Sequence, residues 1–250
     1  MNDLPTVLRR PSDDKLAAAR SAAARVSRLH GGQSDTRTLE THPALSGLLP
    51  GGALRAGAAY SVTGSTALAM ALMAGPSAAG AWCGVVGLPG FGAEAAAGLG
   101  VDLDRVVLVP EPGAGWRSAL AALVDALTLV VVQPPADAGP DTGPDREVTG
   151  AEASRLGARL RARGGVLVVC GTWPACEARL SVSELSWSGL GAGHGHLTGR
   201  QVTVLAQGRG TAVRPRRTRL WLPGADGEIR PVEDTPVEPA EPGWVHEAAG

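Results

Sequence analysis

Five short apolar runs alternate with helix-type segments between Ala58 and Cys170, and this alternation constrains the fold more than any other feature of the chain. The expected strands cover residues 58–62, 81–86, 105–109, 127–132 and 165–170, and the expected helices cover 66–73, 91–99, 116–126 and 150–163. Strands that alternate with helices build parallel sheets, because each helix carries the chain back across one face of the sheet. The sequence therefore predicts an α/β fold with a mostly parallel sheet flanked by helices.

The pattern changes after Trp173-Pro174. Residues 179–187, 201–207 and 217–222 are typical of strands joined by glycine-rich turns, which indicates an antiparallel meander on one edge of the sheet. Ahead of the core, residues 13–29 predict an amphipathic helix that docks either on the parent domain or on a partner. We therefore expect an N-terminal arm and helix over 1–41, a core with its meander over 42–222, and a disordered acidic tail over 223–250.

Composition excludes several classes of protein. The chain is 44% hydrophobic and 19% charged, so it can form a core, and its formal net charge of -1 argues against nucleic-acid binding through bulk charge. No apolar run has transmembrane length, and charges throughout the first thirty residues argue against a signal peptide. The three cysteines form no CxxC motif. We expect a reduced, cytoplasmic protein with no structural zinc and no other metal.

The strand–turn–helix at Ala58 to Met73 stands where a phosphate-binding loop would lie. Such a loop needs a glycine-rich turn, a lysine for the β- and γ-phosphates and a Ser or Thr for Mg²⁺. The only lysine of the chain, Lys15, belongs to the expected N-terminal helix, and the second glycine of the loop is missing. The candidate degenerate loop consists of Ser61, Thr63, Gly64, Ser65, Thr66, Ala67 and Leu68.

The stretch from Leu45 to Val132 resembles the ATPase core of the RecA recombinase family. The residues that carry this resemblance are 48–57, before the first core strand, and Gly98–Val107, which is close to that family's GVDLDNL stretch. By this resemblance Ala67 takes the place of the lysine and Leu68 that of the Mg²⁺-binding hydroxyl. Gln133 takes the place of a metal-associated Asp, and residues 87–90 follow the second strand, where the family carries an acid that activates water. We therefore expect no ATP hydrolysis, no enzyme activity and no cofactor, although helix amides alone still leave weak phosphate binding open.

The second half of the chain narrows the resemblance. Residues 160–174, the stretch 185–196 and the arginine-rich strand pair that follows resemble the degenerate RecA-like accessory proteins of bacterial mutasomes, the ImuA-type group, over about residues 12–232. This resemblance implies a non-catalytic adapter in SOS-induced translesion synthesis. Its partners would be a catalytically inactive Y-family polymerase homologue and an error-prone C-family polymerase, and it would join the nucleoid during DNA damage. The alternatives are an active RecA-type DNA-dependent ATPase, which requires the missing lysine, and a RecA-related inhibitor of cell division.

Several residues are candidates for contacts with DNA or a partner: Arg214, Arg216, Arg217, Arg219, His194, His196 and Trp244. Strand alternation would place Arg217, Arg219 and Trp221 on one face, where they hold phosphates, hold an acidic partner or blunt an edge strand. The acidic tail offers a third reading, in which it folds back over the basic strands and screens them. The two histidines lie in a glycine-rich stretch, which is either a contact loop or an exposed hairpin turn.

Three tryptophans and two aspartates have expected roles that depend on where the fold places them. Trp244 is either a docking anchor or an incidental residue of the tail. Trp173 is expected in the core, and Trp116, which follows a Gly-Ala-Gly stretch, is expected to line the surface. Asp102 and Asp104 are expected to form a turn before a strand rather than a catalytic pair.

Overall fold

The computed structural model describes residues 17–18, 21, 38–135, 148–191, 194–208 and 214–232. The main sheet contains β3 (Ala59–Thr63), β4 (Cys83–Val86), β5 (Val106–Val109), β6 (Leu129–Val132), β7 (Val166–Cys170), β8 (Ala178–Gly191), β9 (His194–Gly208), β10 (Arg216–Trp221) and β11 (Arg230–Pro231). A small second sheet pairs β1 (Thr38–Leu39) with β2 (Leu54–Arg55). The helices are α2 (Pro43–Ser46), α3 (Thr66–Ala78), α4 (Ala93–Gly98), α5 (Trp116–Ala126) and α6 (Gly150–Arg163), with 3₁₀ turns η1 (Pro50–Gly52), η2 (Leu103–Arg105) and η3 (Gly113–Gly115).

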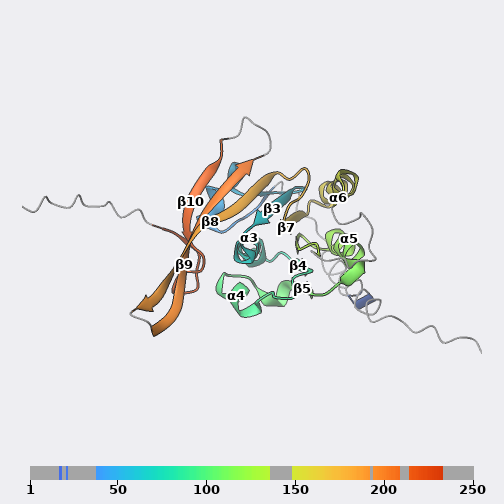
Figure 1. Cartoon of the computed structure of the whole chain (residues 1–250). Coiled ribbons are helices and arrows are strands. Elements are labelled where there is room, and N and C mark those ends of the chain that lie inside the picture. The colour runs from blue at the N-terminus through green and yellow to red at the C-terminus, as the bar shows by residue number, and fades with distance from the viewer. Residues whose placement is uncertain are drawn as a thin grey trace, which may run out of the picture.

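The main sheet has the strand order β11-β10-β9-β8-β3-β7-β6-β4-β5, and it combines a parallel part with an antiparallel part (Figure 1). Strand β8 joins the two parts, because it pairs parallel to β3 on one side and antiparallel to β9 on the other. The expected α/β class and the meander on one edge are both confirmed. This arrangement places the carboxyl ends of β3, β4, β6 and β7 along one rim of the sheet.

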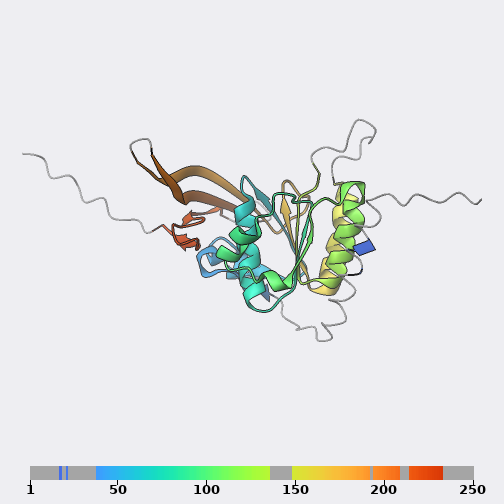
Figure 2. The same ribbon diagram turned by 90° about the horizontal axis from the view of Figure 1, so that it is seen from below.

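Helices cover both faces of the parallel part, with α3 and α4 on one side and α5 and α6 on the other (Figure 2). The strands between them are apolar on both faces, and every residue of β4 and β6 is buried. Val, Leu and Ala fill the two resulting core layers, and Tyr60 is the only fully buried aromatic among the large core side chains of the described residues. Its hydroxyl accepts a hydrogen bond of 2.7 Å from the backbone N–H of Arg55.

Local signals set the ends of the helices. Helix α6 begins with a capping box, in which Thr149 and Glu152 satisfy one another's backbone N–H groups, and it ends at Gly164 in the left-handed conformation. Helix α3 was expected to end before Pro76, but it continues through Pro76 to Ala78. The segment Glu40–Thr41 packs so closely on Gly75 that a Cβ there would lie 2.7 Å from a backbone atom.

The β8–β9 hairpin is longer than the sequence indicated. Its strands have 14 and 15 residues, and they continue through most of the glycine-rich stretch that we expected to form a turn. A register shift lies between Ser188 and Leu190, where Gly189 adopts φ 101°, and a Cβ at Gly189 would overlap the carbonyl oxygen of His196. The outer half of the hairpin projects beyond the helices (Figures 1 and 2).

The two ends of the chain lie mostly outside the described residues. Of the helix expected over 13–29, the structure describes Ala17, Ala18 and Ser21, and all three are helical. Disorder was expected from residue 223 onward, which is wrong for 223–232, because Ile229 is buried against the core and β11 pairs with β10. Residues 233–250, including Trp244, lie outside the described residues. Within the described part of the chain, no helix is both long and apolar enough to cross a membrane.

Candidate functional site

The turn between β3 and α3 holds the candidate degenerate phosphate loop, and it is very short. Only Gly64 and Ser65 separate the last residue of β3 from the first residue of α3. Gly64 adopts φ +82°, and a Cβ on it would lie 3.0 Å from the carbonyl oxygen of Val182 in β8. The Ser65 Oγ caps the helix by accepting a hydrogen bond of 3.2 Å from the N–H of Leu68. The turn is therefore closed by its own cap and packed against the neighbouring strand.

The positions that carry phosphate chemistry in related loops hold apolar side chains here. A working loop wraps backbone amides around the phosphates over an eight-residue motif, whereas three of the corresponding residues here belong to β3 and three to α3. Ala67 is half-buried, and Leu68 is 0% exposed, inside the core cluster that packs α3 on the sheet. Neither side chain presents a donor or a metal ligand at this turn.

Arg200 of β9 reaches the same turn from the hairpin. Its Nη2 donates to the Ser65 Oγ at 3.2 Å, and its Nε donates to the carbonyl oxygen of Leu222 at 2.8 Å. The guanidinium carbon lies 5.5 Å from the ring centroid of Trp187, its cross-strand neighbour. Burial lowers the pKa of Arg200 from its ordinary value. A cationic group thus stands at the N-terminus of α3, the end of a helix that attracts anions.

Sequence reasoning did not single out Arg200 as part of this site. It is 135 residues from Ser65 along the chain, and only the register that pairs Arg200 with Trp187 brings it to the turn. The alternation of side chains in the β8–β9 hairpin was visible in the sequence, but the pairing of the two strands was not.

The other two RecA-like positions lie on the same rim of the sheet and are in backbone contact. Gln133 follows β6 and is half-buried, and its N–H donates to the carbonyl oxygen of Val86 at 2.9 Å. Its own carbonyl oxygen lies so close to Gly87 that a Cβ there would overlap it. Leu88 is buried with 3% of its surface exposed. The two strand ends therefore present packed backbone and apolar side chains, with a neutral amide where the family carries an acid.

The arginine-rich strand shows the expected alternation. Arg217 and Arg219 are exposed, whereas Arg216 is half-buried and Arg214 is exposed just before the strand. Trp221 shares the face of Arg217 and Arg219, and the Arg230 guanidinium lies 5.9 Å from its ring centroid.

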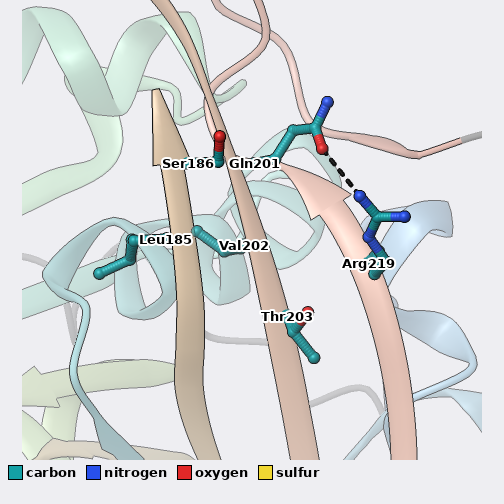
Figure 3. A pocket seen from close by; sticks show the side chains of 6 residues that line it. All are labelled: Leu185, Ser186, Gln201, Val202, Thr203 and Arg219. Carbon is teal, nitrogen blue, oxygen red and sulfur yellow. Dashed lines mark hydrogen bonds between the residues drawn. The ribbon is translucent and has the colours of Figure 1, made fainter. Parts of the chain in front are cut away.

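A shallow hollow of about 290 Å³ opens on this side of the meander, lined by Leu185, Ser186, Gln201, Val202, Thr203 and Arg219. Figure 3 shows Gln201 and Arg219 pointing toward one another across neighbouring strands, and the Arg219 Nη2 donates to the Gln201 Oε1 at 3.0 Å.

The hairpin carries three of the exposed large apolar side chains of the described residues. Leu185 is 54% exposed, Trp187 is 51% exposed and Leu197 is 51% exposed. His196 is also exposed, while the side chain of His194 lies outside the described part of the structure, as does Trp244. The hairpin is therefore an arm with several exposed apolar side chains.

Other candidate residues have structural roles. Trp116 was expected at the surface, but it is only 5% exposed, because it begins α5 with its ring packed into the second core layer. Trp173 is in the core, as expected. Asp102 caps the turn before β5 by accepting from the N–H of Asp104 at 3.1 Å. The described residues include no group of three or more His, Cys, Asp or Glu side chains that could hold a metal ion.

Comparison with known proteins identifies the family. Residues 47–175, more than half of the chain, match the family described as the MT3502 N-terminal domain. The chain belongs to this family. The uncharacterized protein Rv3395c of Mycobacterium tuberculosis is 31% identical over 178 residues, which cover 67% of this chain and 83% of that protein. The match to the MT3502 N-terminal domain family includes the β3–α3 turn and the parallel part of the sheet.

A solved structure supports the fold assignment of this family member. The crystal structure of the KaiC-like protein PH0186 from Pyrococcus horikoshii OT3 superimposes with a TM-score of 0.53, at 14% identity, over 79% of this chain and 99% of that chain. At this level of identity the likeness concerns the fold alone. The core of this chain is RecA-like, as the motifs of its first half indicated.

Proposed function

We propose that this protein is a non-catalytic RecA-like adapter that organises error-prone translesion polymerases in SOS-induced DNA damage tolerance. Its partners in this proposal are a catalytically inactive Y-family polymerase homologue and an error-prone C-family polymerase. The ImuA-type resemblance of residues 12–232 supplies the pathway and the partners. The geometry of the β3–α3 turn supports an adapter rather than an ATPase.

The observation that supports the non-catalytic part of the proposal is the short and closely packed β3–α3 turn. Two residues separate β3 from α3, and the carbonyl oxygen of Val182 packs against Gly64. A triphosphate would bring several negative charges beside this oxygen, which is itself a hydrogen-bond acceptor. No lysine lies in the turn, and the Arg200 guanidinium is already hydrogen-bonded to Ser65 and to the Leu222 carbonyl oxygen. Leu68 cannot leave the core to make room, because burying a leucine stabilises a fold by about 1.5–3 kcal/mol.

The projecting hairpin supports the adapter part of the proposal. Leu185, Trp187 and Leu197 expose about half of their surfaces on one arm of the molecule. A Trp side chain on a rigid element is a frequent energetic centre of protein interfaces. Arg200 stacks on Trp187 and is bonded to Ser65, so the arm is held against the core rather than left to swing. This arrangement suits a surface that docks onto another protein.

A nucleotide titration tests the non-catalytic part. Purified protein is titrated with ATP and Mg²⁺ by calorimetry, with and without single-stranded DNA, and ATP hydrolysis is followed in parallel. We expect no binding up to the high-micromolar range and no DNA-stimulated hydrolysis. The variant Arg200→Ala is the informative companion, because it removes the hydrogen bond from Arg200 to Ser65 while leaving the short turn intact. Hydrolysis that survives purification and is lost on changing Gly64 would show an active ATPase and defeat the proposal.

A capture experiment tests the adapter part. The full chain is used to capture the Y-family homologue, the C-family polymerase and a cytoskeletal division GTPase, each purified separately. The variant Leu185→Ser/Trp187→Ser is expected to lose polymerase capture by at least about tenfold, the effect of removing one interface anchor. The matched control is Leu103→Ser/Leu108→Ser, which changes two apolar side chains that are 40% and 47% exposed on the opposite edge of the sheet. Capture of the GTPase alone would favour the division-inhibitor alternative.

A further inference from the structure

The antiparallel strands present an exposed face that the helices do not cover. Arg179 of β8 pairs with Gln207 of β9, and Arg217 and Arg219 of β10 pair with Leu205 and Thr203 of the same strand. Directly paired residues point to the same side of a sheet, so the three arginines share one face. Arg179, Arg217 and Arg219 are all exposed, and we call the surface that they form the basic face.

The basic face continues the side of the sheet that α5 and α6 cover elsewhere. Arg179 is in register with Ser61 of β3, and Ser61 is in register with Val169 of β7, which packs in the core layer beneath α5 and α6. Helices α5 and α6 pack against the parallel strands only. The buried side chains of β8, β9 and β10 lie on the other side of the sheet, in the core layer beneath α3. The sheet therefore extends past its helical cover at β8–β10 (Figure 2).

Charge on these three strands is strongly one-sided. They contain Arg179, Arg217 and Arg219 on the basic face, and Arg200 and Arg216 on the opposite side, against a single carboxylate, Glu184. Because the whole chain has a formal net charge of -1, the opposite charge must be concentrated elsewhere. A surface of this kind takes an anionic occupant.

The chain itself carries a segment of the opposite charge directly beyond this face. Residues 233–250 contain five carboxylates (Glu233, Asp234, Glu238, Glu241 and Glu247) and no lysine or arginine, and they lie outside the described residues. The last described residue is Val232, whose N–H donates at 2.9 Å to the carbonyl oxygen of Arg219. The acidic segment therefore starts at the rim of the basic face.

The acidic segment is long enough to cover the basic face, and its prolines favour binding through side chains. Trp244 is 12 residues beyond Val232 (244 minus 232), which spans up to about 40 Å when extended. The three strands of the face are only about 10–15 Å across, so the whole face is within reach. Pro236, Pro239 and Pro242 lack the N–H groups that an added strand would need, so the segment would bind through its side chains.

We infer that residues 233–250 dock on the basic face of their own chain. Their carboxylates lie against Arg179, Arg217 and Arg219, and Trp244 enters the hollow beside Leu185 and Arg219. The segment acts as a tethered anionic occupant, so another polyanion reaches the face only by displacing it. Tethering gives the segment an effective concentration in the millimolar range, which makes weak surface ion pairs sufficient.

Photo-cross-linking of the full chain tests this inference. The substitution Trp244→p-benzoylphenylalanine places a photoreactive group in the segment, and mass spectrometry locates the cross-links after irradiation at low protein concentration. We expect cross-links to residues 185–186, 201–203 and 219. The yield should fall at least about threefold in Arg179→Gln/Arg217→Gln/Arg219→Gln, because three surface ion pairs are lost. It should also fall when the ionic strength rises to 1 M, where the screening length is about 3 Å.

Two controls keep the test decisive. The variant Arg155→Gln/Arg161→Gln/Arg163→Gln removes the same charge from exposed positions of α6 and is expected to keep the wild-type cross-linking pattern. Changing the five carboxylates of the segment to amides should reduce the yield without touching the core, which separates lost docking from misfolding. Cross-links scattered over the molecule, or a yield that the arginine changes leave unaltered, would overturn the inference. Cross-links between isotopically light and heavy chains in a mixture would also overturn it, by making a second copy the occupant.

Discussion

Arg200 is expected to be among the most important polar side chains for stability, and the substitution Arg200→Ala tests this. The change removes hydrogen bonds to the Ser65 Oγ (3.2 Å) and to the Leu222 carbonyl oxygen (2.8 Å), together with the contact to Trp187. Hydrogen bonds to charged groups are worth about 1.5–3 kcal/mol each, and a cation–π contact adds about 0.5–1 kcal/mol. Water and the N–H of Leu68 still serve Ser65, so we expect a net loss of about 2–4 kcal/mol rather than the full sum.

Urea unfolding of the full chain measures this loss. The midpoint should fall while the m-value stays constant, because the surface exposed on unfolding hardly changes. The matched control is Arg155→Ala, which changes an exposed arginine of α6 and is expected to cost less than about 0.5 kcal/mol. A double-mutant cycle with Ser65→Ala separates the hydrogen bond between the two side chains from the helix-capping role of Ser65, and a coupling of about 0.5–1.5 kcal/mol is expected.

The result that would refute this reasoning is equally specific. If Arg200→Ala costs no more than Arg155→Ala, the guanidinium does not hold the hairpin on the core. If the coupling with Ser65 is absent, Arg200 contributes through its packing on Trp187 or its bond to Leu222, and the β3–α3 turn is not linked to the hairpin through this pair.

Three further predictions follow from individual contacts. Gly189→Ala should destabilise the hairpin by at least about 1–2 kcal/mol, because the residue adopts φ 101° and its new Cβ would overlap the His196 carbonyl oxygen. Hydrogen exchange should show faster amide exchange confined to the hairpin, and unchanged exchange would contradict the prediction. Tyr60→Phe should cost about 1–2 kcal/mol by urea unfolding, because the 2.7 Å hydrogen bond from the Arg55 N–H is lost in the interior, and a neutral result would mean that water replaces it. Burial raises the pKa of Cys83 to about 12, so its thiol should resist iodoacetamide at pH 8 until the protein is unfolded, and rapid alkylation of native Cys83 would count against the buried placement.

The parallel core was readable from the sequence because its signals are local. Helix α6 has the bounds that were expected, since Thr149, Glu152 and Gly164 mark its ends within one turn of chain. The apolar runs of the central strands differ from the expected bounds by only a few residues, because strands buried on both faces must be apolar throughout. The absence of an amine at Ala67 and of a hydroxyl at Leu68 was also visible, since it depends on residue type alone.

Features that depend on distant residues were missed. Trp116 follows a glycine-rich stretch that is typical of an exposed loop, yet α5 turns its ring into the core. Residues 223–232 are rich in turn formers, yet the burial of Ile229 and the pairing of β11 with β10 order them. The glycines of the hairpin were read as a turn, although Gly189 serves a bulge within a long strand pair.

At the candidate site, residue types determine one part of the result and tertiary contacts determine the other. Amino-acid types established that the turn after β3 lacks a lysine and a second glycine, and that Leu68 has no hydroxyl, because chemistry that a chain does not contain cannot appear on folding. They did not establish what stands at the turn instead. The register of β8 and β9 places the Val182 carbonyl against Gly64 and the Arg200 guanidinium on Ser65. Such contacts join residues more than 100 positions apart, and strand pairing alone determines which of them meet.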